Sequence, residues 1–465
     1  MQKKRHSFKG SLGFVMAAAG SAVGLGNIWR FPYLAARDGG GIFLAVYLVL
    51  ALTFGFTLLT AEVAIGRMTK QSPLTAYGRI DKRFGFLGHL ACIIPALIMP
   101  YYCVIGGWVL KYLFASAAEG NAATASEGYF VGFITGQWAP IIFFLIFLAA
   151  NAFIIYRGVN KGIEAISKIL MPALIVLVLV IAIFSLTLSY TDADGVTRTG
   201  LQGLKILVVP NLREVSAGEF FMVVVDAMGQ LFYSLSIAMG IMIAYGSYMP
   251  DDANLAGSIN QIEIFDTVIA FLAGMMIIPA VYTFIGAEGM KSQGTGLMFT
   301  TLPKVFSSMG AFGRVMAIMF FAMVLFAALT SSMSIMEAVV SSLMDRFGMS
   351  RAKAVAIETL VALAGGILVC LGYNLLYFEL PLPNGATAQI LDVLDYVSNN
   401  VLMPVVAIGT CILVGWVIGP DRIIEEVEKG GRRMGRKRLF KVMIKFVAPV
   451  LLVILFLRSV GIIRI

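Results

Sequence analysis

The chain has 465 residues, of which 59% are hydrophobic and only 13% are charged. Soluble globular proteins carry about 25% charged residues, so this composition excludes a water-soluble body of this size and predicts a protein embedded in lipid. The net charge of +9 then indicates basic loops beside a membrane, and we expect no nucleic-acid partner.

Apolar stretches recur along the whole chain. A membrane helix needs about 20 mostly apolar residues. The last stretch is short, and Lys445 and Arg458 bound it; their long side chains can reach the membrane interfaces. Eleven helices are predicted, at 10–29, 41–61, 84–110, 128–156, 169–191, 227–250, 267–287, 315–336, 359–378, 396–420 and 446–457.

The basic residues predict the orientation. They gather at 3–9, 67–83 and 422–438, whereas the 111–127 loop has only Lys111. Cytoplasmic loops carry the excess of lysine and arginine, so we expect a cytoplasmic N-terminus and, with an odd number of spans, an external C-terminus. The predicted location is the inner (plasma) membrane.

The first helix is interrupted by polar and small residues. Gly20, Gly24 and Gly26 lie within seven residues, followed by Asn27 and Arg30. Close packing of membrane helices accounts for the first two glycines. It does not account for an arginine at this depth, which marks a functional site by default.

A second interrupted helix follows about 200 residues later, between 229 and 240. Ser234, Ser236 and Gly240 weaken an otherwise apolar helix. Broken helices in corresponding places of two halves point to the central site of a transporter, because unwound carbonyls bind cations and half-helix N-termini attract carboxylates.

Four segments carry a resemblance to a known family: residues 17–33, residues 229–240, Leu329–Ser332 and the pair Tyr101–Tyr102. The chain resembles the neurotransmitter:sodium symporter family in its short bacterial branch. This implies an all-α polytopic membrane protein with two inverted five-helix repeats, broken first and sixth helices, and an eleventh helix. The implied divisions are an N-terminal latch (1–9), the two repeats (10–187 and 218–417), an external loop (188–217), a lid loop (288–312), a basic loop (418–440) and the last helix (441–465).

The resemblance also implies two sodium ions, which would be held by oxygen atoms as hard cations are. A back-bond to the same helix is the ordinary role of a membrane serine or threonine, and a helix N-cap is the alternative for Asp266. We expect Asp266 to ligate sodium and to replace the charge of chloride. The first site would use the Ala22 carbonyl, Asn27, Ser234 and Asp266; the second would use the carbonyls of Gly20, Val23 and Ala327 with the hydroxyls of Thr330 and Ser331.

The implied substrate is an α-amino acid. Monoamine carriers of the family have an aspartate where this chain has Gly24, so an amine without its own carboxylate would lack a counter-charge here. The mainly apolar lining favours a neutral, hydrophobic side chain. Tyr102 with the N–H groups of Leu25 and Gly26 would bind the carboxylate; Ser21, Ala22, Tyr233, Ser234 and Ser236 the amine; and Ile98, Tyr233, Ala238, Met239, Ser331 and Ile335 the side chain.

Two gates are expected around this site. Arg30 and Asp395 would pair on the outside, and Arg5 and Asp345 on the inside. Glu62 is interpreted as a structural hydrogen-bond acceptor.

We therefore predict a sodium-coupled, chloride-independent importer of a neutral amino acid that works by alternating access. A proton-coupled carrier of the same fold and a transport-dead amino-acid sensor are the alternatives. The two histidines make neither a metal site nor a nucleophile–base pair, so no enzyme is expected. The exact amino acid, the stoichiometry, proton counter-transport and a homodimer are left open.

Overall fold

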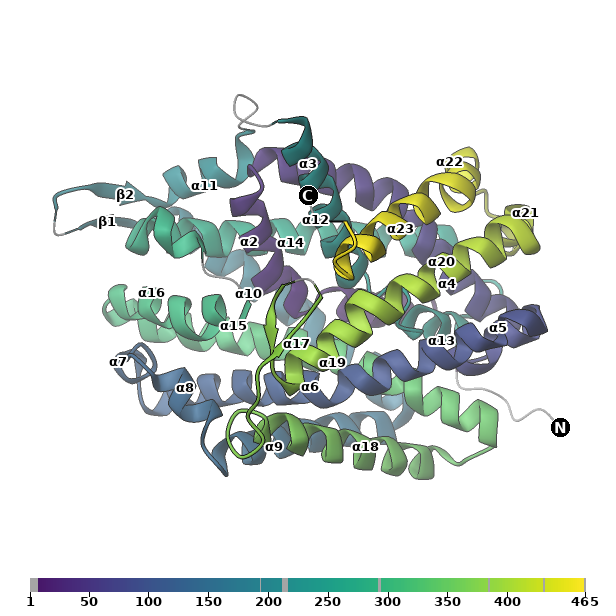
Figure 1. Ribbon diagram of the computed structural model, residues 1–465, viewed down its shortest axis with the longest axis horizontal. Coiled ribbons are helices and arrows are strands. Elements are labelled where there is room, and N and C mark those ends of the chain that lie inside the picture. The colour runs from purple at the N-terminus through teal and green to yellow at the C-terminus, as the bar shows by residue number, and fades with distance from the viewer. Residues whose placement is uncertain are drawn as a thin grey trace.

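The computed structural model describes residues 7–192, 194–210, 216–291, 294–383, 385–429 and 431–463. Its helices lie side by side along the longest axis of the molecule (Figure 1). The two strands β1 (Ser189–Thr191) and β2 (Thr197–Thr199) lie at one end, with α21 (Pro420–Glu428) and α22 (Lys437–Val442) at the other.

The predicted all-α membrane architecture is confirmed. Among the described residues, nine helices are long and apolar enough to cross a membrane, and the bent pair Ser11–Ala22 and Gly26–Arg37 makes ten. A further span is broken between α12 (Ala217–Ser234) and α13 (Ile241–Ser247), which completes the eleven that the hydropathy predicts.

The first five spans occupy the N-terminal part of the chain. They consist of α1 (Ser11–Ala22) with a π-helical turn (Gly26–Arg30) and α2 (Phe31–Arg37); α3 (Gly41–Leu50), a π-helical turn (Ala51–Gly55) and α4 (Phe56–Thr69); α6 (Gly85–Ala118); α9 (Ala139–Tyr156); and a π-helical turn (Val159–Glu164) with α10 (Ala165–Leu186). Short helices α5 (Pro73–Ile80), α7 (Asn121–Thr124), α8 (Tyr129–Ile134) and α11 (Gly200–Val208) lie in the connections.

The remaining spans follow the broken α12 and α13. They are α14 (Leu255–Ile285); α17 (Ala311–Phe347); α18 (Arg351–Leu371); α19 (Ile390–Asp395), a π-helical turn (Tyr396–Leu402) and α20 (Met403–Ile412); and α22 with a π-helical turn (Met443–Val447) and α23 (Ala448–Ser459). The lid loop expected at 288–312 holds α15 (Gly294–Gly296) and α16 (Leu302–Ser308), and the antiparallel pair β3 (Leu380–Pro381) and β4 (Thr387–Ala388) precedes α19.

Several predicted spans differ from the structure at their bounds: α17 ends at Phe347 and not at 336, and α18 is Arg351–Leu371 and not 359–378. Two further spans differ for identifiable reasons. The stretch 128–156 is divided into α8 and α9, because Pro140 occupies the first turn of a new helix. The seventh span begins at Leu255, twelve residues before the predicted start at 267. Its first turns carry Glu263 and Asp266, which are buried against protein. A search for apolar stretches without charged residues therefore leaves these turns out.

The broken sixth span is held against the second span by backbone contact. A Cβ on Gly66 of α4 would lie 2.1 Å from the carbonyl oxygen of Ile243 in α13, and one on Gly246 of α13 would lie 2.3 Å from that of Val63. Only glycine permits helices to approach this closely, and this is the usual packing of membrane helices. The second half of the broken helix, α13, is therefore fixed in place against the second span.

Candidate transport site

The first helix loses its regular backbone immediately after Ala22. Val23 leaves the helical region with ψ of 84°. The axis bends by 48° between α1 and the segment Gly26–Arg37. In the break, the N–H of Gly24 donates to the Ala22 carbonyl over 2.9 Å. The break turns main-chain polar groups toward the interior of the protein.

The sixth span breaks through a strained backbone. Ser236 and Ala238 have positive φ values of 54° and 65°, and Gly240 follows at 72°. Such conformations are costly for residues with a Cβ and persist where surrounding structure holds them. The Ala238 N–H donates to Glu62 Oε1 over 2.7 Å, and Ser236 Oγ donates to the Ser21 carbonyl over 3.2 Å. Glu62 is therefore a structural acceptor, as predicted, and the two breaks are hydrogen-bonded to each other.

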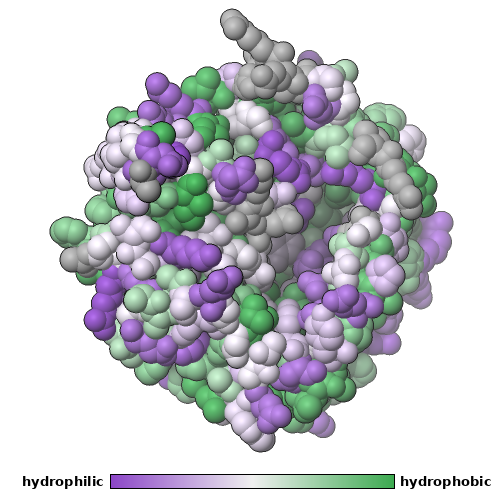
Figure 2. All heavy atoms as spheres, turned by 60° about the vertical axis from the view of Figure 1, so that its left-hand side comes forward, coloured by the Kyte–Doolittle hydropathy of each residue, from purple (hydrophilic) through white to green (hydrophobic). Residues whose placement is uncertain are grey.

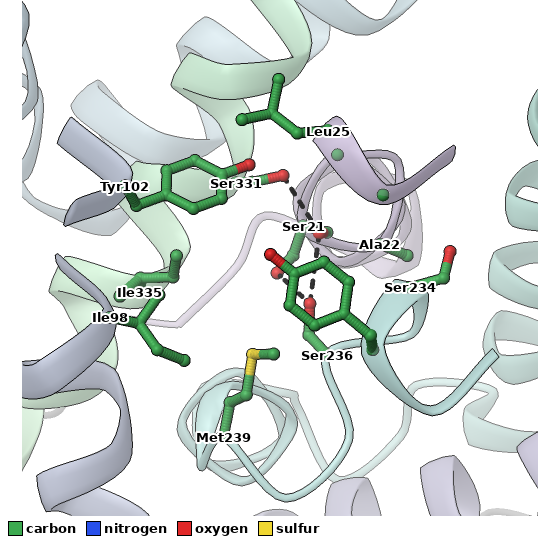
Figure 3. A pocket seen from close by; sticks show the side chains of 13 residues that line it. Ser21, Ala22, Leu25, Ile98, Tyr102, Ser234, Ser236, Met239, Ser331 and Ile335 are labelled. Carbon is green, nitrogen blue, oxygen red and sulfur yellow. Dashed lines mark hydrogen bonds between the residues drawn. The ribbon is translucent and has the colours of Figure 1, made fainter. Parts of the chain in front are cut away.

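A central cavity lies where the two breaks meet α6 and α17. Figure 3 shows side chains of α6 and α17 on one side of it and the broken segments of α1 and α12 on the other. Its volume is about 20 Å³, so side chains must move apart for an amino acid to enter. The lining residues are Ser21, Ala22, Gly24, Leu25, Gly26, Ile98, Tyr102, Tyr233, Ser234, Ser236, Met239, Ser331 and Ile335.

The cavity differs from the predicted substrate set at two positions. Ala238 does not line it, and its backbone N–H donates to Glu62 instead. Gly24 does line it, and a Cβ there would lie 2.8 Å from Ser331 Oγ and 3.3 Å from the Tyr102 hydroxyl. A side chain at position 24 would thus push directly into the space between these two hydroxyls.

Beside the cavity, four buried polar side chains converge. Asn27 Nδ2 donates to Asp266 Oδ1 over 2.8 Å, and Ser234 Oγ donates to the same oxygen over 2.5 Å. Ser234 Oγ also lies 3.0 Å from Asn27 Oδ1. Tyr47 donates to the other carboxylate oxygen over 2.8 Å. These oxygens, with the nearby Ala22 carbonyl, form a donor set suited to a hard monovalent cation.

A second group of oxygens lies where α1 crosses α17. Ser331 Oγ lies 3.3 Å from the Gly20 carbonyl, and Thr330 Oγ1 lies 3.1 Å from the Ala327 carbonyl. A Cβ on Gly20 would come within 3.1 Å of Thr330 Cβ, so the two helices approach closely at this point. Val23, the fifth predicted ligand, is buried at the end of the same turn.

An outer cavity of about 340 Å³ adjoins the central one. Leu25, Tyr102 and Tyr233 line both cavities and so form the partition between them. The face toward which β1 and β2 project is shown in Figure 2, where hydrophilic side chains surround a recess.

The expected outer ion pair is not formed directly. Arg30 and Asp395 both line the outer cavity, but no contact within 4.0 Å joins them in the described part of the chain. Asp395 instead accepts hydrogen bonds from Tyr101 over 3.0 Å and from Asn399 over 2.6 Å. Arg30 is exposed to the cavity, where water solvates its charge. A direct ion pair with Asp395 would therefore contribute little free energy.

On the opposite side the passage is closed by packing. Phe8 is buried and packs edge-on against Phe14, Tyr245 and Tyr248. Its N–H donates to the Tyr248 carbonyl over 3.2 Å. The predicted partner Arg5 lies outside the described residues.

Asp345, the other half of the predicted inner gate, accepts a hydrogen bond from the Ser72 N–H over 2.6 Å. This contact joins the C-terminal end of α17 to the start of α5. Asp345 therefore anchors a loop at the same side of the molecule that Phe8 closes.

Comparison with known proteins decides the family. The model of the sodium:neurotransmitter symporter family matches residues 5–126 and 136–464. The chain belongs to the sodium:neurotransmitter symporter family. The resemblance carried by the broken helices is thereby confirmed, and the protein is a transporter and not an enzyme.

Relatives of this symporter span bacteria, archaea and animals. It is 32% identical to an uncharacterised sodium-dependent transporter of Bacillus subtilis, over 99% of both chains. It is 33% identical to one of Methanocaldococcus jannaschii, over 92% of this chain and 85% of the relative. The crystal structure of MhsT in complex with L-phenylalanine superposes with a TM-score of 0.84 at 32% identity, covering 98% of this chain and 100% of MhsT.

Tyr47 is the site residue that sequence reasoning missed. It lies in the apolar stretch 41–61, where a search for charged residues finds nothing. The available signal is its hydroxyl, since a buried tyrosine O–H in a membrane helix needs a partner. That the partner is Asp266, 219 positions away, follows only from packing.

Proposed function

We propose that this symporter imports a neutral, hydrophobic amino acid together with sodium, independently of chloride. The observation that carries the proposal is the junction of two broken helices at one small, mostly apolar cavity with a buried carboxylate beside it. Sodium would bind at Asn27, Ser234, Asp266 and the Ala22 carbonyl, in contact with the substrate carboxylate.

The nature of the substrate is supported by the charges around the cavity. No aspartate, glutamate, lysine or arginine is among its lining residues, so a substrate with a net charge would be buried without a partner. A zwitterion brings a carboxylate for the sodium ion and an amine for the carbonyls. Ile98, Met239 and Ile335 then offer an apolar environment to its side chain, and MhsT holds L-phenylalanine in its crystal structure.

Chloride independence is supported by Asp266. Its carboxylate supplies one fixed negative charge next to the proposed first sodium site, so no mobile anion is needed to balance the ion there. A second sodium ion would bind between α1 and α17, at Gly20, Val23, Ala327, Thr330 and Ser331.

Alternating access would use the partition and the two gates. Leu25, Tyr102 and Tyr233 would close over the substrate, and Arg30 would approach Asp395 as the outer cavity contracts. Release would require Phe8 to leave its aromatic contacts, aided by Arg5 and Asp345. We place the N-terminus in the cytoplasm and the C-terminus outside, in the plasma membrane.

A binding screen of the twenty amino acids tests this proposal. Purified symporter in detergent is heated with each amino acid in sodium and in choline chloride, and ligand binding is read from the rise in Tm. We expect stabilisation by large neutral amino acids in sodium only. Stabilisation of equal size in choline would favour a proton-coupled carrier.

Transport itself separates a carrier from a sensor. In proteoliposomes we expect sodium-driven uptake of the amino acid selected by the screen, and the same rate after chloride is replaced by gluconate. Binding without uptake or counterflow would identify a transport-dead sensor, and loss of uptake in gluconate would contradict chloride independence.

A further inference from the structure

A third cavity, larger than the other two, lies apart from the transport site. Its lining comes from the end of the molecule that carries α21 and α22, and Figure 1 shows these two helices at that end. Its volume is about 420 Å³. It is formed by α4, the first turns of α14 and the segment between α21 and α22. Its lining residues are Phe56, Asn254, Ala256, Gly257, Asn260, Arg432, Arg433, Met434, Gly435 and Arg436.

Arg436 forms one wall of this cavity, and its guanidinium is held by hydrogen bonds and by a contact with an aromatic ring. Its guanidinium donates to Glu263 Oε2 over 2.7 Å, to Asn260 Oδ1 over 2.5 Å and to the Leu52 carbonyl over 2.7 Å. Its Cζ also lies 3.6 Å from the centre of the Phe56 ring. These contacts tie the basic loop to the second and seventh spans and give the cavity a defined wall.

The charges of Arg432 and Arg433 are not balanced in the same way. Both side chains are exposed, and neither forms a hydrogen bond or a close ion pair with a residue in the described ranges. Glu428 interacts electrostatically with Arg433, but its carboxylate pairs with Lys437. No aspartate or glutamate is among the residues that line the cavity. The first turn of α14, with Asn254 as its N-cap, adds the positive end of a 31-residue helix. The cavity is therefore suited to an anion.

The cavity borders a surface suited to hydrocarbon. Leu52, whose carbonyl binds Arg436, is 47% exposed. Ile264, one turn beyond Asn260 on α14, is 61% exposed, and Val442 on α22 is 52% exposed. In a chain of this family such side chains face lipid tails. A ligand here meets arginines at one end and apolar helices at the other.

We propose that this cavity binds the phosphodiester headgroup of an anionic membrane lipid, such as phosphatidylglycerol, with its acyl chains lying along α14 and α22. Arg432 and Arg433 contact the phosphate, since guanidinium groups bind phosphate oxygens in pairs of parallel hydrogen bonds. Basic pockets between membrane helices at the cytoplasmic side are a recurrent form of lipid recognition. Free phosphate is also an anion but makes no use of the apolar surface.

Thermal unfolding of the full-length symporter in detergent tests the proposal. The protein is titrated separately with phosphatidylglycerol, phosphatidylcholine and inorganic phosphate. We expect phosphatidylglycerol to raise Tm in a saturable way, and the other two to have little effect. In the double variant Arg432→Gln/Arg433→Gln, we expect the apparent affinity for phosphatidylglycerol to fall about thirtyfold, and in each single variant about fivefold.

The matched control is Arg422→Gln/Arg438→Gln. It removes two exposed charges from the same end of the chain but none from the cavity lining. We expect it to keep the wild-type affinity, and sodium-dependent amino-acid binding shows that each variant is folded. Should the double variant not fold, the single variants provide the same comparison.

Three results would overturn the proposal. The first is phosphatidylglycerol binding that survives in the cavity variants. The second is an equal loss in the control, which would indicate a diffuse attraction to basic residues. The third is equal stabilisation by inorganic phosphate, which would indicate a site for a soluble anion.

Discussion

Tyr47 donates its hydroxyl hydrogen to Asp266 Oδ2 over 2.8 Å and thereby joins the second and seventh spans in the interior of the protein. Both residues are almost completely buried. The bond leaves Asp266 Oδ1 facing Asn27 and Ser234, which is the orientation that a cation between these groups requires.

Replacing this tyrosine should therefore weaken sodium binding. In Tyr47→Phe, the carboxylate loses one fixed partner, and hydrogen bonds to charged groups contribute about 1.5–3 kcal/mol. We expect the sodium concentration needed for half-maximal amino-acid binding to rise about tenfold or more. The control is Tyr77→Phe, which removes a buried hydroxyl that bonds Thr410 away from the site. An equal change in both variants would mean that the effect is one of general stability.

Removal of the carboxylate itself should have a larger effect. In Asp266→Asn and Asp266→Ser, the fixed negative charge beside the proposed sodium ion is lost. Truncating a buried charged partner costs about 2–5 kcal/mol, so we expect sodium affinity to fall about thirtyfold or more.

The serine variant also tests the role assigned to this charge. If the charge of Asp266 takes the place of chloride, amino-acid binding by Asp266→Ser should recover in part when chloride replaces gluconate in the medium. Sodium titrations of amino-acid binding in the two anions measure this. Unchanged sodium dependence in either variant would contradict the first-site assignment.

Gly24 should limit the size of the site. A Cβ at this position would lie 2.8 Å from Ser331 Oγ, so Gly24→Ala overfills the space at the two hydroxyls. Overpacking costs about 1–3 kcal/mol, which predicts amino-acid binding weakened about tenfold. Gly132→Ala is the control, since a Cβ there would meet no atom within 4 Å. Binding by Gly24→Ala at wild-type strength would show that Gly24 does not border the substrate.

The strained segment of the sixth span depends on Glu62. In Glu62→Ala the N–H of Ala238 is left buried without its acceptor, which costs about 1–3 kcal/mol. In Glu62→Gln the side-chain carbonyl still accepts this hydrogen, so we expect little loss. Thermal unfolding in detergent without ligand distinguishes the two. A loss of the same size in the glutamine variant would show that the charge, and not the hydrogen bond, matters.

A buried ion pair holds α21 against the second span. Arg67 donates from Nε to Glu426 Oε1 over 2.8 Å, and the two side chains are 0% and 3% exposed. Arg67→Met removes one of the two partners of the Glu426 carboxylate. The negative charge of Glu426 is then compensated only in part, by the exposed Lys429. We expect a loss of about 3 kcal/mol in the free energy of unfolding. The double variant Arg67→Met/Glu426→Met should recover most of it, whereas Arg83→Gln, which breaks an exposed pair with Asp81, should change little.

Much of this protein is determined by the sequence on its own. The eleven spans follow from the lengths of the apolar stretches, and the two breaks follow from glycine and serine at 20–26 and 234–240. These are local properties, because the cost of exposing a backbone group or a charge to lipid is set within one segment. The family resemblance then indicated twelve of the thirteen residues that line the central cavity; the remaining one is Gly24.

Only the tertiary structure decided which remote groups meet. The carboxylate of Glu62 lies at the strained N–H of Ala238, Tyr47 lies at Asp266, and a water-accessible cavity lies between Arg30 and Asp395. None of these contacts can be predicted from the spacing of apolar residues along the sequence, since each joins helices far apart in the chain. They depend on the close approach of backbones at glycines such as Gly66 and Gly246, and packing of that kind is settled by all of the helices together.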